Sequence, residues 1–127
     1  MVCFKISGAF TGLKKVHNSF FNNIISEFFV NDEEVVACYC RNRVGFVLTT
    51  KRIIAINRKG LLGRNNEITS IPYNKITSFY WEAKGSIIVN AKLELYLDKN
   101  VRARFEFIGN KNIIDVYRII STNVLVA

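Results

Sequence analysis

Residues 93–107 read LELYLDKNVRARFEF, and this stretch decides the fold class. Apolar residues alternate with charged or polar ones on both sides of the Asp-Lys-Asn at residues 98–100, and a period of two is typical of strands that bury one face. A three-residue loop at that position keeps the apolar side chains on one face, because it sets Leu97 opposite Val101. A two-residue loop would mix buried with exposed positions. The stretch therefore predicts an antiparallel hairpin with a defined register.

Charged residues on the other face of this hairpin agree with the same register. It pairs Glu94 with Arg104 and Lys92 with Glu106. Each such cross-strand pair contributes about 0.2–1 kcal/mol. Asn100 suits the left-handed backbone conformation that a three-residue loop requires. Charge, apolar pattern and loop chemistry therefore predict the same pairing.

Further strand-like runs precede the hairpin and indicate a mainly β fold. They lie at 35–41, 44–49, 51–58, 67–71 and 76–84. Short turns at 41–43 and 50–51 join the first three runs, and a loop at 59–63 carries two glycines that can adopt positive φ. Pro72 ends the fourth run, because proline cannot donate to a strand ladder. With the hairpin, these runs predict about seven antiparallel strands in a small barrel or sandwich.

Helical spacing marks both ends of the chain. Residues 12–29 repeat apolar residues every three or four positions, with Thr11 as the N-cap, and predict an amphipathic helix. Its apolar stripe is Leu13, Val16, Phe20, Phe21, Ile24, Ile25 and Phe28. A second helix closes the chain, with Asn112 as its cap and Asp115 in its first turn. We expect this second helix to cover one opening of the barrel. Its buried stripe is Ile113, Val116, Tyr117, Ile120 and Val124.

Length and composition fit one folded domain. The chain has 127 residues, 50% of them hydrophobic, and carries 18 Lys+Arg against 10 Asp+Glu, a net charge of +8. No run approaches the roughly 20 apolar residues that a membrane span needs, and the N-terminus lacks the pattern of a signal peptide. Three cysteines, an odd number, do not suit a secreted disulfide framework. We therefore expect a cytoplasmic protein with reduced thiols.

Two motifs resemble the bacterial pleckstrin-homology (PH) domain family. Residues 47–56 read VLTTKRIIAI and are followed by RKGLLG at 58–63. Residues 71–76 read IPYNKI, which is similar to the step by which that family enters its next strand. The later strands fall where the family has its own, so the resemblance covers residues 30–125.

The resemblance implies a seven-strand PH-like barrel capped by the C-terminal helix. It also implies ring-like homo-oligomers, often pentameric, and no enzymatic activity. The chain is then divided into an N-terminal helical extension at 1–29 and a PH-like domain at 30–127. Thr50 departs from the family pattern, which usually has Asn there, and Asn31 stands where a Gly often precedes the first strand. The family's biochemical role is largely unassigned.

Positive charge is concentrated in one part of the chain. Between Val35 and Asn66 there is no acidic residue, and basic residues give that stretch +7 of the total +8. The resemblance places residues 41–43 in the loop where eukaryotic PH domains hold phosphoinositide headgroups. The candidate anion-binding residues are Arg41, Arg43, Arg58, Lys59 and Arg64. Alternatively, these side chains form a solvated polar face, because adjacent hairpin turns often lie at opposite ends of a barrel.

The histidine and the cysteines favour structural roles. His17 is the single histidine, and no carboxylate at helical spacing accompanies it to form a metal site or a base. Cys38 and Cys40 face the same way on a strand, but one-residue spacing is not the usual zinc pattern, and a buried cysteine behaves as a small hydrophobe. We therefore assign no catalytic, cofactor-binding or metal-binding residue.

Two further motifs have both a binding and a structural interpretation. The loop at residues 60–63, GLLG, matches the Gly-x-x-Gly loop of KH modules, which clamps a nucleotide backbone, but it lies between strands and so favours a turn. Phe79, Tyr80 and Trp81 could stack on bases. Consecutive strand residues alternate faces, so core packing or a subunit interface is the favoured role.

The leading functional hypothesis is a non-enzymatic interaction module that self-assembles, because the apolar stripe of the N-terminal helix needs a partner. The candidate interface residues are Phe20, Phe21, Ile24, Phe28 and Trp81. The alternative is a binder of anionic surfaces, either acidic lipid headgroups or nucleic acid, through the basic residues. An unidentified protein is a further partner class. A hydrolase is the weakest hypothesis, since no nucleophile, base and orienting group can be named.

Overall fold

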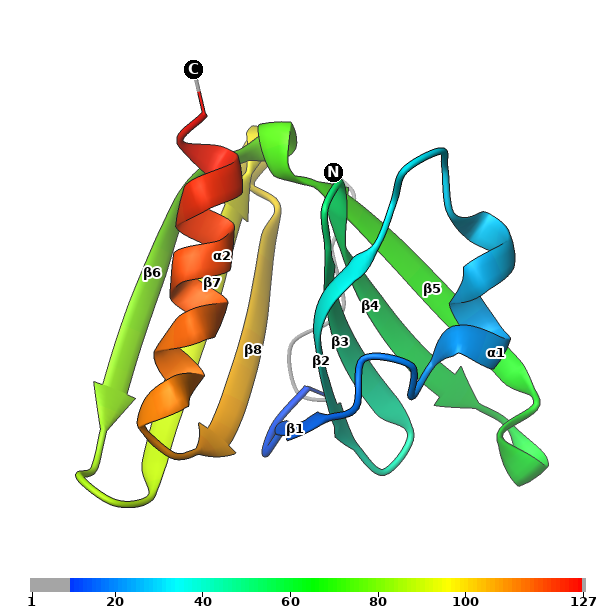
Figure 1. The fold of residues 1–127 in the computed structure, drawn as a ribbon, viewed down its shortest axis with the longest axis horizontal. Helices are drawn as coiled ribbons and strands as arrows, with labels where there is room; N and C mark the ends of the chain where they lie inside the picture. The colour runs from blue at the N-terminus through cyan, green and yellow to red at the C-terminus, as the bar shows by residue number, and fades with distance from the viewer. Residues whose placement is uncertain (1–9, 127) are drawn as a thin grey trace.

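Two antiparallel sheets and a C-terminal helix build the protein (Figure 1). The computed structural model describes residues 10–126. The first sheet has five strands in the order β1-β2-β3-β4-β5, and the second has three in the order β6-β7-β8. The strands are β1 (Lys14–Val16), β2 (Val35–Arg41), β3 (Val44–Thr49), β4 (Arg52–Lys59), β5 (Asn65–Pro72), β6 (Ile76–Lys84), β7 (Val89–Leu97) and β8 (Arg102–Gly109). The helical segments are α1 (Asn22–Ile25), α2 (Ile114–Val124) and the short 3-10 turns η1 (Ser26–Phe28), η2 (Leu61–Gly63), η3 (Tyr73–Lys75), η4 (Asp98–Asn100) and η5 (Lys111–Ile113).

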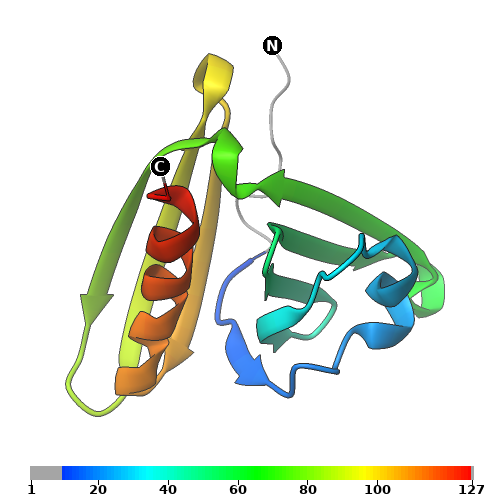
Figure 2. The same ribbon diagram turned by 45° about the horizontal axis from the view of Figure 1, so that its top comes forward.

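Strands β2 to β8 correspond to the seven expected from the sequence, so the mainly β fold with a helical cap is confirmed. The second sheet and α2 lie beside the first sheet (Figure 2). Val116 and Ile120 of α2 are buried in the main core, and Tyr117 packs on Phe79 and Trp81 with ring centroids 5.5 and 6.0 Å away. The helix therefore covers the aromatic residues on the inner face of β6.

The central strand of the first sheet, β3, is covered on both faces, which explains why it is apolar. Every residue of β3 is buried. Phe46 faces the main core between the two sheets, where its ring centroid lies 4.6 Å from that of Phe105 and 5.0 Å from that of Phe107. Val47 faces a second, smaller core beneath the N-terminal segment. A strand covered on both faces needs no polar alternation.

The hairpin of β7 and β8 has the predicted register. Leu93 pairs with Phe105, and the Leu97 amide donates to the Val101 carbonyl at 2.8 Å. Asn100 has a positive φ of 62°, as the loop required, and Lys99 also has a positive φ of 63°. The apolar residues of both strands face the main core, so the pattern that predicted the pairing also explains its stability.

Charged side chains on the outer face of this hairpin form different ion pairs from the expected ones. Glu94 lies opposite Arg104 and Lys92 opposite Glu106, as predicted. The salt bridges nevertheless join Arg102 to Glu94 and Arg104 to Glu106, at 3.9 and 3.3 Å. Exposed pairs of this kind contribute little, so the apolar pattern rather than the charges fixes the register.

The prediction of an amphipathic helix over residues 12–29 is wrong. The segment contains strand β1, a turn, and a single helical turn, α1, followed by η1. The apolar residues at helical spacing divide between two cores on opposite faces of the first sheet: Leu13 enters the main core, while Phe21 and Ile25 enter the smaller one. One helix cannot present a single stripe to both faces, so the chain extends and turns instead.

Residues 10–16 join the two sheets at one corner. The Leu13 amide donates to the Glu106 carbonyl at 3.0 Å, and the Ile108 amide donates to the Leu13 carbonyl at 2.9 Å. Directly afterwards, β1 pairs with β2. Thr11 is therefore not a helix cap. The division of the chain at residue 30 stays a prediction, and residues 1–9 lie outside the described part.

The helical cap near the C-terminus lies two residues earlier than expected, and α2 itself begins at Ile114. The Asn110 side chain accepts a hydrogen bond from the Asn112 amide at 2.9 Å, so Asn110 is the cap instead of Asn112. The reason is that the 3-10 turn η5 precedes α2, and the unpaired amides of that turn are the ones that need a side-chain acceptor.

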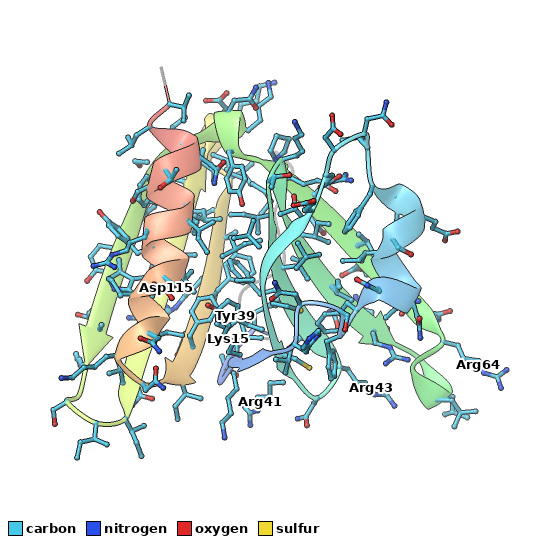
Figure 3. The ribbon with its side chains drawn as sticks, viewed as in Figure 1. Lys15, Tyr39, Arg41, Arg43, Arg64 and Asp115 are labelled. Atoms are coloured by element: carbon cyan, nitrogen blue, oxygen red, sulfur yellow. The ribbon has the colours of Figure 1, made fainter. Side chains whose placement is uncertain are left out.

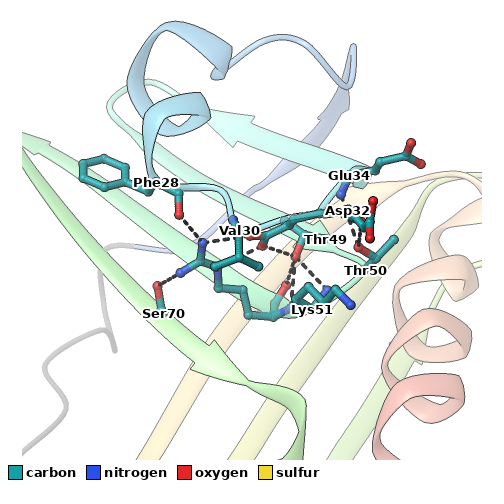
Figure 4. A network of polar contacts seen from close by, with 10 residues as sticks. Phe28, Val30, Asp32, Glu34, Thr49, Thr50, Lys51 and Ser70 are labelled. Carbon is teal, nitrogen blue, oxygen red and sulfur yellow. Dashed lines mark hydrogen bonds and ion pairs between the residues drawn. The ribbon is translucent and has the colours of Figure 1, made fainter.

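A buried ion pair ties the N-terminal segment to the β3–β4 turn (Figure 4). The Glu33 carboxylate has a fully buried side chain and accepts from Arg52 Nη2 at 2.8 Å and Arg52 Nε at 2.9 Å. It also accepts from the Thr49 hydroxyl at 2.7 Å and the Val30 amide at 3.0 Å. Arg52 Nη2 donates further to the Phe28 carbonyl at 2.8 Å. Every strong acceptor site on the carboxylate is therefore used, as a buried charge requires.

The same network reaches β5 and the corner between the sheets. Arg52 Nη1 donates to the Ser70 hydroxyl at 3.1 Å. The Tyr73 hydroxyl donates to the Thr49 carbonyl at 2.7 Å, and burial, together with the nearby Glu33, raises the pKa of Tyr73, which stays protonated. The motifs at 47–56 and 71–76 thus contact each other through Thr49, Arg52 and Tyr73.

Replacing Arg52 by methionine should destabilise the fold strongly. The substitution keeps much of the side-chain volume but leaves the Glu33 carboxylate buried without its guanidinium partner, so we expect a loss of about 3–5 kcal/mol in the free energy of unfolding. Urea denaturation followed by circular dichroism measures it. Lys59→Met is the control, because Lys59 pairs with Glu67 at the exposed surface and should cost under about 1 kcal/mol. Equal losses in the two variants would show that the buried pair is not a special constraint.

Acid should destabilise the protein partly through Glu33. Burial raises the pKa of this carboxyl, but the hydrogen bonds from Arg52 and Thr49 outweigh burial and hold the pKa below its ordinary value of 4.5. The stabilisation is therefore complete above the unfolded pKa and is lost as the pH falls through the lower folded pKa. Glu33→Gln should reduce stability at neutral pH and flatten its decline below pH 4.5. Glu67→Gln, at an exposed position, should leave that decline parallel to the wild type.

Candidate functional site

The hairpin turns of the first sheet alternate between its two ends. In an antiparallel sheet with consecutive neighbours, the β2–β3 and β4–β5 turns share one end, and the β3–β4 turn lies at the other. Arg41 and Arg43 therefore lie at the same end as Arg64, as Figure 3 shows along the lower edge of the molecule. The acid-free stretch is thus divided, because Lys51 and Arg52 lie at the opposite end.

Two contacts hold the neighbouring turns together. Arg43 Nη1 donates to the Gly60 carbonyl at 2.6 Å, and the Arg58 amide donates to the Arg43 carbonyl at 2.8 Å. Asn42 has a positive φ of 52°, which allows the tight β2–β3 turn. The predicted cations Arg41, Arg43, Arg58, Lys59 and Arg64 are accordingly brought together at one end of the sheet.

Strand β1 adds two cations that the sequence analysis missed. Lys14 pairs with Cys40, and Lys15 with Tyr39, so both lysines lie beside Arg41. Arg41 itself donates to the Thr11 hydroxyl at 3.2 Å. The helix predicted over residues 12–29 includes both lysines. A strand that pairs with β2 positions them instead next to the β2–β3 turn.

We name this surface the basic edge. It consists of Lys14, Lys15, Arg41, Arg43, Arg58, Lys59 and Arg64, all exposed. Within residues 10–126, one salt bridge reaches it, from Lys59 to Glu67 at 3.1 Å. Most of its charge is therefore not neutralised by the protein, and the edge can attract anions over the distance of a Debye length.

Chemistry at cysteine or tyrosine is disfavoured near this edge. Burial, with a smaller effect from Cys40, raises the pKa of the Cys38 thiol to about 12. Burial also raises the pKa of Tyr39 to about 12, and Asp115 adds to that rise. A hollow of about 140 Å³ opens at Lys15, Tyr39 and the turn before α2. The protonated Tyr39 phenol at this hollow and the protonated Cys38 thiol on the opposite face of the sheet are poor nucleophiles at neutral pH.

The remaining sequence motifs occupy structural positions. His17 Nδ1 lies 2.7 Å from the Ser19 hydroxyl in the turn after β1. Cys38 and Cys40 both face the smaller core, while Tyr39 faces the main one. Residues 10–126 hold no group of three histidines, cysteines or acids placed to bind a metal ion. Cys3 falls outside the described residues.

The apolar candidates for a subunit interface separate into buried and exposed residues. Phe21 is buried in the smaller core against Gly45, where a Cβ would collide with its ring, and Trp81 packs beneath α2. Ile24 is half-buried against the same smaller core. Phe20 and Phe28 remain exposed. These two side chains are the part of the predicted interface that is free to contact another molecule.

The described part of the chain, residues 10–126, has no helix with the length and apolar character to cross a bilayer. The motif at 60–63 forms the turn between β4 and β5, as its structural interpretation predicted.

Comparisons with known sequences and structures agree on one family. The sequence profile described as "Bacterial PH domain" matches residues 6–124, which includes part of the segment expected to be an extension. The uncharacterized protein YjqA of Bacillus subtilis (strain 168) is 29% identical over 73 residues, a match that covers 58% of each chain. The chain therefore spans less than two thirds of that relative's length.

Solved structures show the same fold. A crystal structure of a DUF1696 family protein with a pleckstrin-homology domain from Shewanella loihica PV-4 has a TM-score of 0.70 at 21% identity, covering 90% of this chain and 98% of that one. A pleckstrin homology domain from Shewanella amazonensis SB2B has a TM-score of 0.66 at 26% identity, covering 87% of this chain and all of its own.

Proposed function

The chain belongs to the bacterial PH domain family, and on that premise we propose that it is a non-catalytic interaction module whose basic edge binds an anionic surface. The observation that carries the proposal is the convergence of seven exposed cations from β1, the β2–β3 turn, the end of β4 and the β4–β5 turn. Cations with few ion-pair partners on one edge bind polyanions mainly by charge.

A binding role agrees with what is known of the family and with the local chemistry. PH domains are generally non-catalytic interaction modules, and the relative YjqA is described as an uncharacterized protein. The buried Cys38 and Tyr39 are held protonated, which supports binding over nucleophilic chemistry. We place the module in the cytoplasm, where its thiols stay reduced.

Neutralising part of the basic edge should weaken anion binding. The test variant replaces Lys14, Lys15 and Arg64 with glutamine. Within residues 10–126 these three exposed side chains make no hydrogen bond or salt bridge, so the substitutions should leave the fold intact. Near an anionic surface each lysine or arginine contributes about 1 kcal/mol, so the affinity for anionic vesicles or an oligonucleotide should fall about hundredfold. Sedimentation with vesicles and fluorescence anisotropy of the oligonucleotide, at low and high salt, measure it.

A matched control removes the same charge from the other end of the molecule. Lys51, Lys75 and Lys99 are exposed and lie in the β3–β4 turn, in η3 and in η4. Replacing these three with glutamine gives the same net charge as the test variant and should weaken binding far less. Equal effects of the two variants would mean that net charge alone drives binding. Absence of binding to either anion at low salt would overturn the proposal.

Self-assembly is the second proposed property, and a specific observation favours it. Phe20 and Phe28 expose large aromatic side chains in the N-terminal segment, and aromatic residues are enriched at protein interfaces. We propose that they contribute to a homo-oligomer, with a pentameric ring as the form that the family resemblance implies. Deletion of residues 1–29 would remove β1 and disturb the fold, so point variants are the cleaner test.

Replacing both Phe20 and Phe28 with serine should shift the protein toward the monomer, since these side chains are largely outside the core. Light scattering at several concentrations gives the mass. Tyr80→Ser, an exposed aromatic on the outer face of β6, is the control and should leave the mass unchanged. A wild-type protein that is monomeric at every concentration would contradict the self-assembly proposal.

A further inference from the structure

Two loops at the end of the molecule that carries the basic edge hold aliphatic side chains out in solvent. In the β4–β5 loop, Leu61 and Leu62 are 89% and 72% exposed. In the β6–β7 loop, Ile87 and Ile88 are 83% and 65% exposed. Both loops lie at the lower end of the molecule in Figure 1. Exposing such pairs of large apolar residues to water is unfavourable, and contact with an apolar partner removes this cost.

The backbone fixes the shape of both loops. Leu62 has a positive φ of 65°, a conformation that is strained for a bulky side chain. Gly60 precedes it with a φ of 83°. In the other loop Gly85 has a φ of 110°, and a Cβ there would collide with the Ile88 carbonyl. The exposed leucines and isoleucines are therefore presented by defined turns.

Contacts place these loops at the two ends of the basic edge. Ile88 lines a surface hollow together with Lys14 and Lys15 of β1. At the other end, the Arg43 guanidinium donates to the carbonyl of Gly60, the residue before Leu61. The order along the lower edge is thus an apolar loop, a row of cations and a second apolar loop, and Figure 3 shows Lys15, Arg41, Arg43 and Arg64 along that row.

We propose that this end of the protein docks on an anionic lipid bilayer, with both apolar loops inserted at the interface and the basic edge against the headgroups. The proposal rests on the anion-binding function of the basic edge. Cations flanked by aliphatic residues match a bilayer surface, because negative phosphates lie directly above hydrocarbon. Phosphates of a nucleic acid satisfy the cations but offer no apolar medium for four aliphatic side chains.

The test measures partition onto phosphatidylcholine vesicles with and without phosphatidylserine, and binding to an oligonucleotide in parallel. The two test variants are Leu61→Ser with Leu62→Ser, and Ile87→Ser with Ile88→Ser. Each should lower partition onto the anionic vesicles about tenfold, because the buried apolar area is lost, while leaving oligonucleotide binding unchanged.

The control variant makes the same chemical change at the other end of the molecule. Leu125 and Val126 follow α2 and are 73% and 71% exposed. Replacing them with serine should not change vesicle binding. Insertion is read directly from a Leu61→Trp variant, whose emission should shift to the blue on anionic vesicles and be quenched by brominated acyl chains, relative to the same measurement on the wild type with Trp81 alone.

The outcomes separate this proposal from the one on which it rests. Vesicle binding that needs both the basic edge and the apolar loops, with quenching by brominated chains, supports both. Vesicle binding that needs only the cations keeps anion binding and overturns insertion. Binding to the oligonucleotide but not to vesicles also keeps anion binding and overturns the bilayer as the partner. Binding to neither overturns both.

Discussion

The buried ion pair between Glu33 and Arg52 is the constraint on which the rest of the structure depends. A carboxylate removed from water is stable only if every acceptor site is used, and here two arginine nitrogens, a threonine hydroxyl and a backbone amide use them. Those donors come from the β3–β4 turn and the segment before β2, so the pair fixes the two relative to each other. Through Thr49 the constraint extends to Tyr73, at the corner where the chain leaves the first sheet for the second.

This arrangement gives the two ends of the first sheet different tasks. At one end, the positive charge of Arg52 is neutralised within the fold, since its guanidinium pairs with Glu33 and donates to the Phe28 carbonyl. At the other end the cations are exposed, and their contacts within the described residues go to the Thr11 and Gly60 carbonyls, the Thr11 hydroxyl and the Glu67 carboxylate. Because few of these outward charges are paired with acids, they are available to a partner. The contrast also explains why a single run of basic residues in the sequence does not form a single surface.

The sequence was most informative where one structural demand acts alone. The β7–β8 hairpin has one buried face, so alternation and loop length determine its register. The N-terminal segment packs into two cores. The helical spacing of Leu13, Phe21 and Ile25 therefore combined residues that lie on opposite faces of a sheet. That error also hid Lys14 and Lys15, whose place beside Arg41 depends on strand pairing. Arg43 and Arg58 lie at the same end of the sheet because consecutive hairpin turns alternate between its two ends, which strand order alone predicts. Leu62 instead adopts a backbone conformation that its residue type disfavours.

The corner formed by Leu13 and β8 has a consequence for the folding order. The Leu13 amide and the Glu106 carbonyl, which bond at this corner, are separated by most of the chain. The residues that follow Leu13 form β1, which pairs with β2 of the first sheet. Contacts between distant residues carry a large loop-closure entropy and slow folding. During synthesis, the β2–β5 meander can pair as it emerges, but residues 10–16 must wait for the last hairpin before they close the corner. Until β8 is made, Leu13 has no strand partner there and the main-core face of the first sheet is uncovered, the stage at which association between unfinished chains is most favourable.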